Sequence, residues 1–189
     1  AGSMERFHTD RLVAERIRER DYDDLCIMHS NPVTMATLDG VRSNAVTRTF
    51  LNEKLAHWET YGHGMWVFRN RETHAFTGRG LLEHIDVGGS PEIEVGYAVI
   101  AEEWGKGLAT EMARAIVTIA FTQLPVESLV SFTYPDNVAS RRVMEKAGFS
   151  FERDIEHGGR DLVLYRLPRS AYGGQLAIRL VDGVWVAGG

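Results

Sequence analysis

The chain has 189 residues, of which 44% are hydrophobic and 25% are charged, and its formal net charge is -5. This is the composition of a globular protein with one domain, or with one domain and a small addition. A single cysteine, Cys26, excludes an intramolecular disulfide and an all-cysteine zinc site. The acidic balance argues against a nucleic-acid binder, which normally has a basic surface, and favours a small cationic substrate.

No apolar run approaches the ~20 residues that span a bilayer, and the N-terminus lacks the apolar stretch of a signal peptide. We therefore expect a cytoplasmic protein that has no membrane partner. Residues 1–3, which precede Met4, are interpreted as an expression scar and are excluded from the expected fold.

Strand-like and helix-like patterns alternate along the chain, which is typical of a fold with layers of both kinds. Residues 11–18 alternate as a strand does. Helices are expected to begin at Asp21 and at Pro32, and either Ser43 or Asn44 is suited to cap a longer one. Apolar residues recur at helical spacing in that longer helix: Val46, Phe50, Leu51, Leu55 and Trp58.

The rest of the chain is expected to form further strands and helices, followed by a separate tail. The strands are expected over residues 65–68, 76–85, 92–99, 128–133, 149–155 and 161–167, and the helices over 105–122 and 137–146. The Gly-Gly-Ser-Pro segment at 88–91 predicts a loop. In the tail, Leu176–Val181 and Val184–Ala187 flank Asp182-Gly183, a strong signal for a two-residue hairpin.

The most informative segment is a glycine-containing turn between an expected strand and an expected helix. Gly105 and Gly107 lack a Cβ, so backbone N–H groups there can approach a ligand closely. At a helix N-terminus such groups form an anion site, and a pyrophosphate is its natural guest. Lys106 is not followed by Ser or Thr, and residue 110 is Thr, which excludes the Walker A loop and the dinucleotide fingerprint. A turn without a ligand is the alternative interpretation.

Three motifs occur in a characteristic order and spacing. Thr9–Leu12 reads TDRL, Trp104–Glu111 reads WGKGLATE, and Asn137–Phe149 reads NVASRRVMEKAGF. Together they resemble the GNAT N-acetyltransferases, and most closely the branch of the ribosomal-protein N-terminal (Rim-type) and spermidine acetyltransferases. The resemblance covers about residues 9–168.

The resemblance implies an α+β fold with a mixed, mostly antiparallel central sheet flanked by helices. We expect an acyltransferase domain over residues 4–168. Residues 169–189 have no counterpart in the resemblance and are expected to form an extension with an extra β-hairpin.

The resemblance also implies that acetyl-coenzyme A is the co-substrate, and no His, Cys or carboxylate set has metal-ligand spacing. The residues implied for binding this donor are Val99, Ile100, Trp104, Gly105, Lys106, Gly107, Leu108, Ala109, Thr110, Asn137, Ser140 and Arg142. The backbone N–H of Val99 or Ile100 is expected to stabilise the oxyanion. Asn137 is expected to bind the pantetheine arm or to cap its helix. Candidates for attracting the adenosine phosphates are Lys106, Arg142 and Lys146.

Catalysis by this family requires a neutral amine, yet most of a free alkyl amine is protonated at pH 7, so a base helps. Glu94 is the first candidate base because it lies on the polar face of its expected strand. The next candidates are Glu92, Glu83 and His84. Ser140 resembles a serine that lies near the thiolate leaving group in this branch, which makes it a candidate acid or hydrogen-bond donor. Met144 stands where many members have a tyrosine acid, and that role stays open.

The leading hypothesis is an N-acetyltransferase in which a primary amine attacks acetyl-coenzyme A directly within a ternary complex. The expected specificity loops, 32–47 and 154–161, carry no motif, so the class of amine stays open. The amine belongs to a peptide N-terminus, a polyamine or another small molecule. The alternatives are another acyl donor such as succinyl-coenzyme A, a non-catalytic coenzyme A-binding regulatory module, and a protein–protein module built on the tail. The free strand edges of the tail favour a homodimer or, alternatively, pairing with the chain's own sheet.

Overall fold

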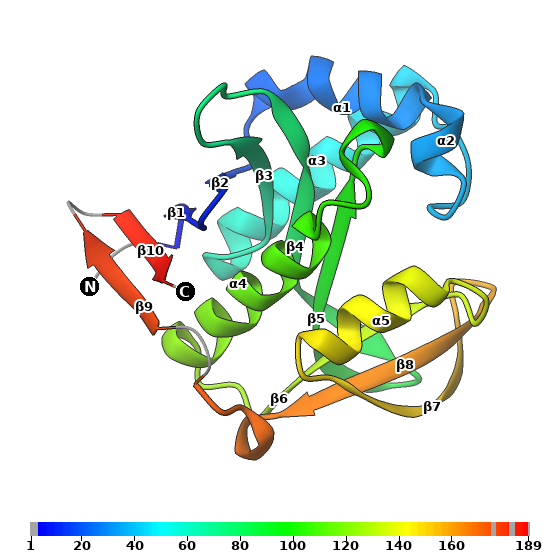
Figure 1. The fold of residues 1–189 in the computed structure, drawn as a ribbon. Helices are drawn as coiled ribbons and strands as arrows, with labels where there is room; N and C mark the ends of the chain where they lie inside the picture. Colours follow the sequence, from blue (N-terminus) through cyan, green and yellow to red (C-terminus); the bar gives the residue numbers. More distant parts are fainter. Residues whose placement is uncertain (1–3, 175–176, 182–183, 189) are drawn as a thin grey trace.

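The computed structural model describes residues 4–174, 177–181 and 184–188. Over these residues the strands form one sheet in the order β7-β8-β6-β5-β4-β3-β2-β1-β10-β9 (Figure 1). The strands are β1 (Arg6–His8), β2 (Leu12–Arg16), β3 (Met65–Asn70), β4 (Phe76–Val87), β5 (Ser90–Val99), β6 (Ser128–Thr133), β7 (Ser150–His157), β8 (Arg160–Pro168), β9 (Ala177–Val181) and β10 (Val184–Gly188). Within this described sheet, β5–β6 and β1–β10 pair in parallel and the other neighbours are antiparallel. The expected mixed, mostly antiparallel sheet is confirmed.

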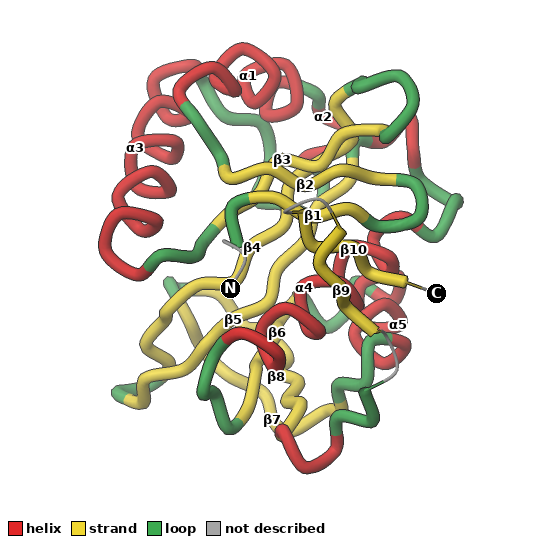
Figure 2. Tube along the Cα trace, turned by 90° about the vertical axis from the view of Figure 1, so that its left-hand side faces the viewer, coloured by secondary structure: helices red, strands yellow, loops and turns green. Residues whose placement is uncertain are grey.

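Helices cover both faces of this sheet. They are α1 (Tyr22–Ser30), α2 (Pro32–Met35), α3 (Asn44–Tyr61), α4 (Leu108–Gln123) and α5 (Val138–Lys146). Figures 1 and 2 show α1 and α3 on one side of the sheet and α4 and α5 on the other. The alternation of β4 follows these layers, because Glu83 contacts Lys54 of α3 whereas Gly80 faces Ile116 of α4.

The centre of the sheet is buried from both sides. Four consecutive side chains of β3 are no more than 2% exposed: Met65, Trp66, Val67 and Phe68. A strand with such a continuous apolar run needs a covering layer on each face. The helix α3 supplies one layer, and its ends follow local signals. The Ser43 hydroxyl accepts the Val46 N–H at 3.2 Å, and Gly62, with a φ of 74°, ends the helix in the left-handed conformation.

Some element boundaries differ from the predicted ones. β4 and β5 are longer than expected because only Gly88 and Gly89 form the turn between them, with φ angles of 60° and 87° that suit a primed hairpin turn. α4 begins at Leu108 rather than at 105, since Gly105 and Gly107 have φ angles of 77° and 78°, outside the right-handed helical region. β1 was not predicted, because three residues show no periodicity.

The tail contributes two strands to the sheet. β9 and β10 pair in antiparallel fashion, as expected, whereas the predicted turn at 182–183 and Leu176 lie outside the described residues. β10 also pairs in parallel with β1, where Phe7 is in register with Trp185. The backbone of the tail therefore extends the chain's own sheet, which is the alternative to a dimer that the sequence left open (Figure 1).

Candidate active site

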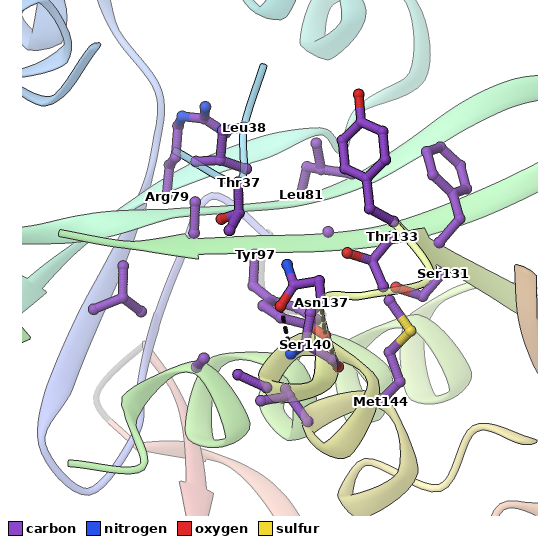
Figure 3. A pocket seen from close by; sticks show the side chains of 18 of the residues that line it. Thr37, Leu38, Arg79, Leu81, Tyr97, Ser131, Thr133, Asn137, Ser140 and Met144 are labelled. Carbon is purple, nitrogen blue, oxygen red and sulfur yellow. Dashed lines mark hydrogen bonds between the residues drawn. The ribbon is translucent and has the colours of Figure 1, made fainter. Parts of the chain in front are cut away.

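A cavity of about 710 Å³ lies where the parallel strands β5 and β6 separate (Figure 3). The two strands are in register at Glu94 and Val130. Beyond this point, residues of both strands line the cavity instead: Tyr97, Ala98 and Val99 of β5, and Ser131, Phe132 and Thr133 of β6. Ligands in open sheets commonly bind outside the carboxyl ends of parallel strands, so the cavity is the candidate active site.

One end of the cavity is formed by the glycine-containing turn before α4. A Cβ at Gly105 would meet open space, and one at Gly107 would lie 3.6 Å from a terminal nitrogen of Arg11. The turn is therefore shaped by positive φ angles rather than by crowding, and it leaves the first N–H groups of α4 facing the cavity side. Bare N–H groups and the helix dipole at this position fit a pyrophosphate.

The segment between β1 and β2 contacts this turn and holds its conformation. The Glu111 carboxylate of α4 accepts hydrogen bonds from the Thr9 hydroxyl at 2.6 Å, the Arg11 N–H at 2.9 Å and the Arg11 Nε at 2.8 Å. Arg11 also donates to the carbonyl oxygen of Lys106 at 2.7 Å. Two motifs that lie about a hundred residues apart in the sequence thus form one ion-paired unit, and that unit holds the conformation of the turn.

The start of α5 forms a second wall of the cavity. The Asn137 side-chain oxygen accepts the Ser140 N–H at 3.1 Å, so Asn137 caps this helix. The Tyr97 hydroxyl donates to the Ser140 carbonyl at 2.9 Å and lies 3.1 Å from the Ser140 hydroxyl. Burial raises the pKa of Tyr97, so its hydroxyl stays protonated. Met144, buried and lacking an acidic proton, lines the cavity beside them.

The sequence pattern did not single out Tyr97 as a site residue. The alternation of β5 places Tyr97 on the face opposite Glu94, but local pattern gives no sign of its hydroxyl contact with a helix more than forty residues later. Both Tyr97 and Ser140, whose hydroxyl groups are 3.1 Å apart, line the cavity.

The amide groups at the end of β5 have different partners. Ile100 donates its N–H to the carbonyl oxygen of Thr77 at 3.0 Å, so that N–H is already bonded. Successive amides of a strand point to opposite edges, which turns the Val99 N–H toward the side where β5 and β6 separate. The Trp104 indole donates to the Val99 carbonyl at 2.8 Å, which fixes the next peptide, between Val99 and Ile100. Of the two expected oxyanion donors, Val99 has the suitable orientation.

Two carboxylates lie side by side on the cavity wall. Glu83 of β4 and Glu94 of β5 are cross-strand partners. Glu83 accepts a 2.6 Å bond from Lys54 and is buried, whereas Glu94 has no ion pair among the described residues. Burial, and then repulsion from Glu83, raise the pKa of Glu94 to about 7. A carboxyl with this pKa is half ionised near neutrality, which suits a general base.

Two other candidate bases, Glu92 and His84, contact side chains away from the cavity. Arg166 binds Glu92 through two hydrogen bonds of 2.9 and 3.0 Å. His84 stacks on Tyr61 with ring centroids 3.8 Å apart and does not line the cavity. The structure thus separates Glu94 from Glu92 and His84, although all of them lie on the two central strands.

The predicted donor-binding residues divide into two groups. Those that line the cavity are Val99, Trp104, Gly105, Gly107, Leu108, Ala109, Thr110, Asn137 and Ser140, and Lys146 joins them. Ile100, Lys106 and Arg142 do not line it. Lys106 pairs with Glu103 at 2.7 Å, and Arg142 is an exposed residue of α5. Local pattern identified the turn, but not the direction of each charged side chain around it.

The part of the chain that the structure describes holds no group of three His, Cys, Asp or Glu side chains arranged to bind a metal ion. None of its helices combines the length and the apolar character that crossing a membrane requires.

Comparison with known proteins agrees with this arrangement. A family model described as the acetyltransferase (GNAT) domain matches residues 11–150. The chain belongs to the GNAT acetyltransferase family. Its resemblance to this family, which was drawn from three motifs, is thereby confirmed, and as a GNAT enzyme it belongs to a family that uses acetyl-coenzyme A.

Relatives and solved structures extend over most of this GNAT chain. The uncharacterized protein YkkB of Bacillus subtilis is 26% identical over 161 residues, which are 82% of this chain and 94% of YkkB. The ribosomal L7/L12 alpha-N-protein acetyltransferase RimL, in complex with coenzyme A, has a TM-score of 0.71 at 18% identity and covers 86% of this chain and 97% of its own. Spermidine N-acetyltransferase from Vibrio cholerae, in complex with CoA and spermine, has a TM-score of 0.69 at 18% identity, with coverages of 85% and 97%. The GNAT fold is shared with the predicted branch.

Proposed function

We propose that this protein transfers the acetyl group of acetyl-coenzyme A to a primary amine by direct attack in a ternary complex. The observation that carries the proposal is one continuous cavity that joins the glycine turn at Gly105 and Gly107 to the carboxyl group of Glu94. An anion site and a base of suitable pKa thus open into the same space. A binding site for coenzyme A alone would not need the second feature.

The donor is held by backbone and helix termini. The N–H groups at the start of α4 bind the pyrophosphate, and Asn137 at the start of α5 faces the pantetheine arm. Bound acetyl-coenzyme A supplies the acetyl group as an activated thioester. The Val99 N–H, which points away from β4 because the Ile100 N–H is bonded to Thr77, is oriented to stabilise negative charge on the carbonyl oxygen during attack.

Protons move at the two ends of the cavity wall. Glu94 accepts a proton from the ammonium form of the acceptor, directly or through water, so that a neutral amine is available. The Ser140 hydroxyl, which lies 3.1 Å from the Tyr97 hydroxyl, donates a hydrogen bond to the departing thiolate and keeps its own proton. The thiolate takes up the proton that the attacking nitrogen loses as the amide forms. Met144 is unable to take this role because a thioether has no acidic proton.

The amine class is proposed at the level of chemistry only. Structural neighbours with the same fold include enzymes named for a ribosomal protein and for spermidine. Peptide N-termini, polyamines and other small primary amines are therefore all included in the proposal.

A thiol-release assay with a panel of amines tests the proposal. Acetyl-coenzyme A alone is the background, and succinyl-coenzyme A is the second donor. We expect amine-dependent thiol release with the acetyl donor, and much less with Glu94→Gln. Calorimetry on the same samples measures coenzyme A binding. Binding without turnover of any amine would make the protein a regulatory coenzyme A-binding module, and turnover with the succinyl donor alone would change the donor.

A homodimer in the cytoplasm remains part of the proposal. β10 covers the edge of β1, and β9 keeps one edge that pairs with no described strand. Such an edge is a template for pairing with a second chain, and two-fold dimers are the commonest assembly.

A further inference from the structure

A buried arginine faces the cavity without an acidic partner. Arg79 of β4 is 7% exposed and lines the cavity on the side of α3 (Figure 3). Its Nε donates to His29 Nε2 at 3.3 Å, and its guanidinium carbon lies 4.8 Å from the centre of the Phe50 ring. Among the described residues its two terminal nitrogens have no hydrogen-bond acceptor, and no carboxylate pairs with it. A buried cation without a partner is costly, and such groups usually have a ligand.

His29 holds this arginine in one orientation. Burial, followed by repulsion from Arg79 and Arg42, lowers the pKa of His29 to about 3, so its ring is neutral at pH 7. Its Nε2 accepts from Arg79, and its Nδ1 therefore carries the hydrogen and donates to the Thr47 hydroxyl at 2.9 Å. The terminal nitrogens of Arg79 are left to the cavity.

A second arginine stands next to Arg79. Arg42, in the loop before α3, also lines the cavity and lies over the same Phe50 ring at 5.1 Å. Burial, and then repulsion from Arg42, lower the pKa of Arg79 to about 9. Arg79 nevertheless stays cationic at neutral pH, because this value is above 7.

The charges around this end of the cavity do not balance. Lys54 is paired with Glu83 at 2.6 Å, and Arg160 is paired with Asp39 at 2.9 Å. At the other end of the cavity Lys146 lines the wall and Glu103 pairs with Lys106. After these pairs are removed, the lining cations that remain near β4 are Arg42 and Arg79, and the remaining acid there is Glu94, whose pKa is raised to about 7. The acceptor end thus has a surplus of positive charge, although the whole chain is acidic.

We propose that the acceptor carries, besides its amine, an anionic group of the carboxylate or phosphate kind that Arg79 and Arg42 bind. This inference rests on the proposed acetyl transfer to an amine, and it narrows the acceptor class. Arginine pairs are suited to such groups because a guanidinium offers parallel N–H donors to two oxygens. Simple polyamines, which carry positive charge only, are disfavoured by the same surplus.

The strand geometry sets the relative positions of amine and anion. Arg79, Leu81 and Glu83 share one face of β4, and Glu94 is the partner of Glu83. Four residues along a strand correspond to ~13 Å, a distance that the long arginine side chain shortens. The anionic group and the amine therefore lie at opposite ends of the acceptor, rather than on one carbon atom.

Matched acceptors test the charge requirement. γ-Aminobutyrate and γ-aminobutyramide have the same amine and chain length and differ in the charge of the far end, and an aminoalkyl phosphate of similar length tests the phosphate source. We expect kcat/KM for the acid or the phosphate to exceed that for the amide by about 10- to 100-fold, which is the usual value of a charged hydrogen-bonded pair. Equal rates for acid, phosphate and amide would overturn the inference while leaving acetyl transfer intact.

Variants assign that preference to the arginines. Arg79→Met and Arg42→Met should each reduce the acid-to-amide ratio of kcat/KM about tenfold or more, and Arg79→Lys should keep part of that ratio. Arg42 is only partly buried, so its variant serves if Arg79→Met fails to fold. Arg20→Met, at a residue whose side chain is 70% exposed and paired with Glu15, is the matched control and should change nothing. An unchanged ratio in both Met variants would refute the assignment.

A binding measurement separates this inference from the proposed reaction. The shift in Tm on addition of γ-aminobutyrate is compared with that on addition of the amide, in the wild type and in Arg42→Met. An Arg42-dependent shift without turnover would preserve the anion site and disprove the acetyl transfer. Turnover of amines that carry no anionic group, without a Tm shift specific to the acid, would support the acetyl transfer and disprove the anion site.

Discussion

Single carboxyl groups on neighbouring strands have different roles here because their partners differ. Glu92 binds Arg166 and Glu83 binds Lys54, whereas Glu94 pairs with no cation among the residues that the structure describes. The like charge of Glu83 and burial together disfavour ionisation of Glu94 and raise its pKa to about 7. The same two strands thus carry a structural ion pair and a group that titrates near neutral pH.

The first prediction concerns catalysis by this group. Glu94→Gln keeps the shape of the side chain and removes its basicity, so kcat should fall by about 10²- to 10⁴-fold while coenzyme A affinity stays nearly unchanged. In the wild type, kcat/KM should rise with pH through about 7, since the ionised carboxylate is the active form. A pH–rate profile of both proteins and of Glu92→Gln measures this. Full activity of Glu94→Gln, or an unchanged acid limb, would remove Glu94 from the role.

The second prediction concerns stability at the same residue. A folded pKa of about 7, above the usual 4.5, means that the folded protein keeps this proton where the unfolded chain has lost it. The stability from this group is therefore complete below about pH 4.5 and is lost as the pH rises through about 7. Glu94→Gln should have a higher Tm than the wild type at about pH 8 and an equal Tm at about pH 4, by thermal melts. A lower Tm of the variant at the higher pH would contradict the burial of an unpaired charge.

At the scale of elements, the turn before α4 combines local freedom with distant support. Gly105 and Gly107 adopt positive φ angles that L-residues avoid, which leaves the helix N-terminus uncovered. The ion-paired unit of Arg11, Thr9 and Glu111 then holds the turn against the first strand region. The anion site depends on both, because glycine alone would leave the turn free to move.

A third prediction tests the glycine. Gly107→Val places a β-branched residue at a φ of 78° and adds methyl groups near the anion site, so Kd for coenzyme A should rise by at least about tenfold. Gly88→Val is the matched control, since Gly88 also has a positive φ, of 60°, but lies in the β4–β5 turn. It should lose similar stability and bind coenzyme A normally in calorimetry. Normal affinity in a folded Gly107→Val protein would rule out the site.

A fourth prediction tests the brace. Arg11→Met removes the side-chain hydrogen bonds to Glu111 and to the Lys106 carbonyl, each a charge-assisted contact of about 1 kcal/mol or more, and keeps the backbone N–H bond to Glu111. Coenzyme A affinity should fall about five- to tenfold, and the KM of the acceptor should stay the same. Arg20→Met, another partly paired surface arginine, provides the comparison in the same titration. Unaltered affinity after loss of the brace would show that the turn keeps its conformation unaided.

At the scale of the molecule, the two proposed binding regions lie on opposite sides of the sheet. The turn at Gly105 and Gly107 precedes α4, which lies on one side, whereas Arg79 and Glu83 face α3 on the other. The net charge of -5 favoured a cationic substrate, but the local surplus at Arg79 and Arg42 indicates an anionic group. Total charge describes the long-range field, and a buried site depends on its own few groups.

The fifth prediction concerns the tail. β10 supplies the partner of β1 in the structure, so deletion of residues 175–189 should expose that edge and lower Tm. Arg169, which donates to three carbonyls at the end of α4, is retained. Light scattering over a concentration series distinguishes the assemblies. A dimeric wild type and a monomeric truncated protein would support a dimer through the tail, and a wild type that is monomeric throughout would refute it.

Local sequence determined much of this protein. The helix caps at Ser43 and Asn137, the paired glycines of the turns and the apolar periodicities act over a few residues, so the elements and the candidate anion turn were predictable. The resemblance then supplied the mixed, mostly antiparallel sheet flanked by helices. A strand of three residues, β1, had no such signal.

Tertiary structure decided which charged groups are free. Glu92 and Glu94 are equivalent in the alternating pattern of one strand, and only Arg166, more than seventy residues later, distinguishes them by pairing with Glu92. No sequence pattern assigned a role to Arg79. Only the tertiary structure buries this residue against His29 and Phe50, with its terminal nitrogens facing a cavity. Reactivity depends on desolvation and on partners across space, and neither is encoded in residues adjacent along the chain.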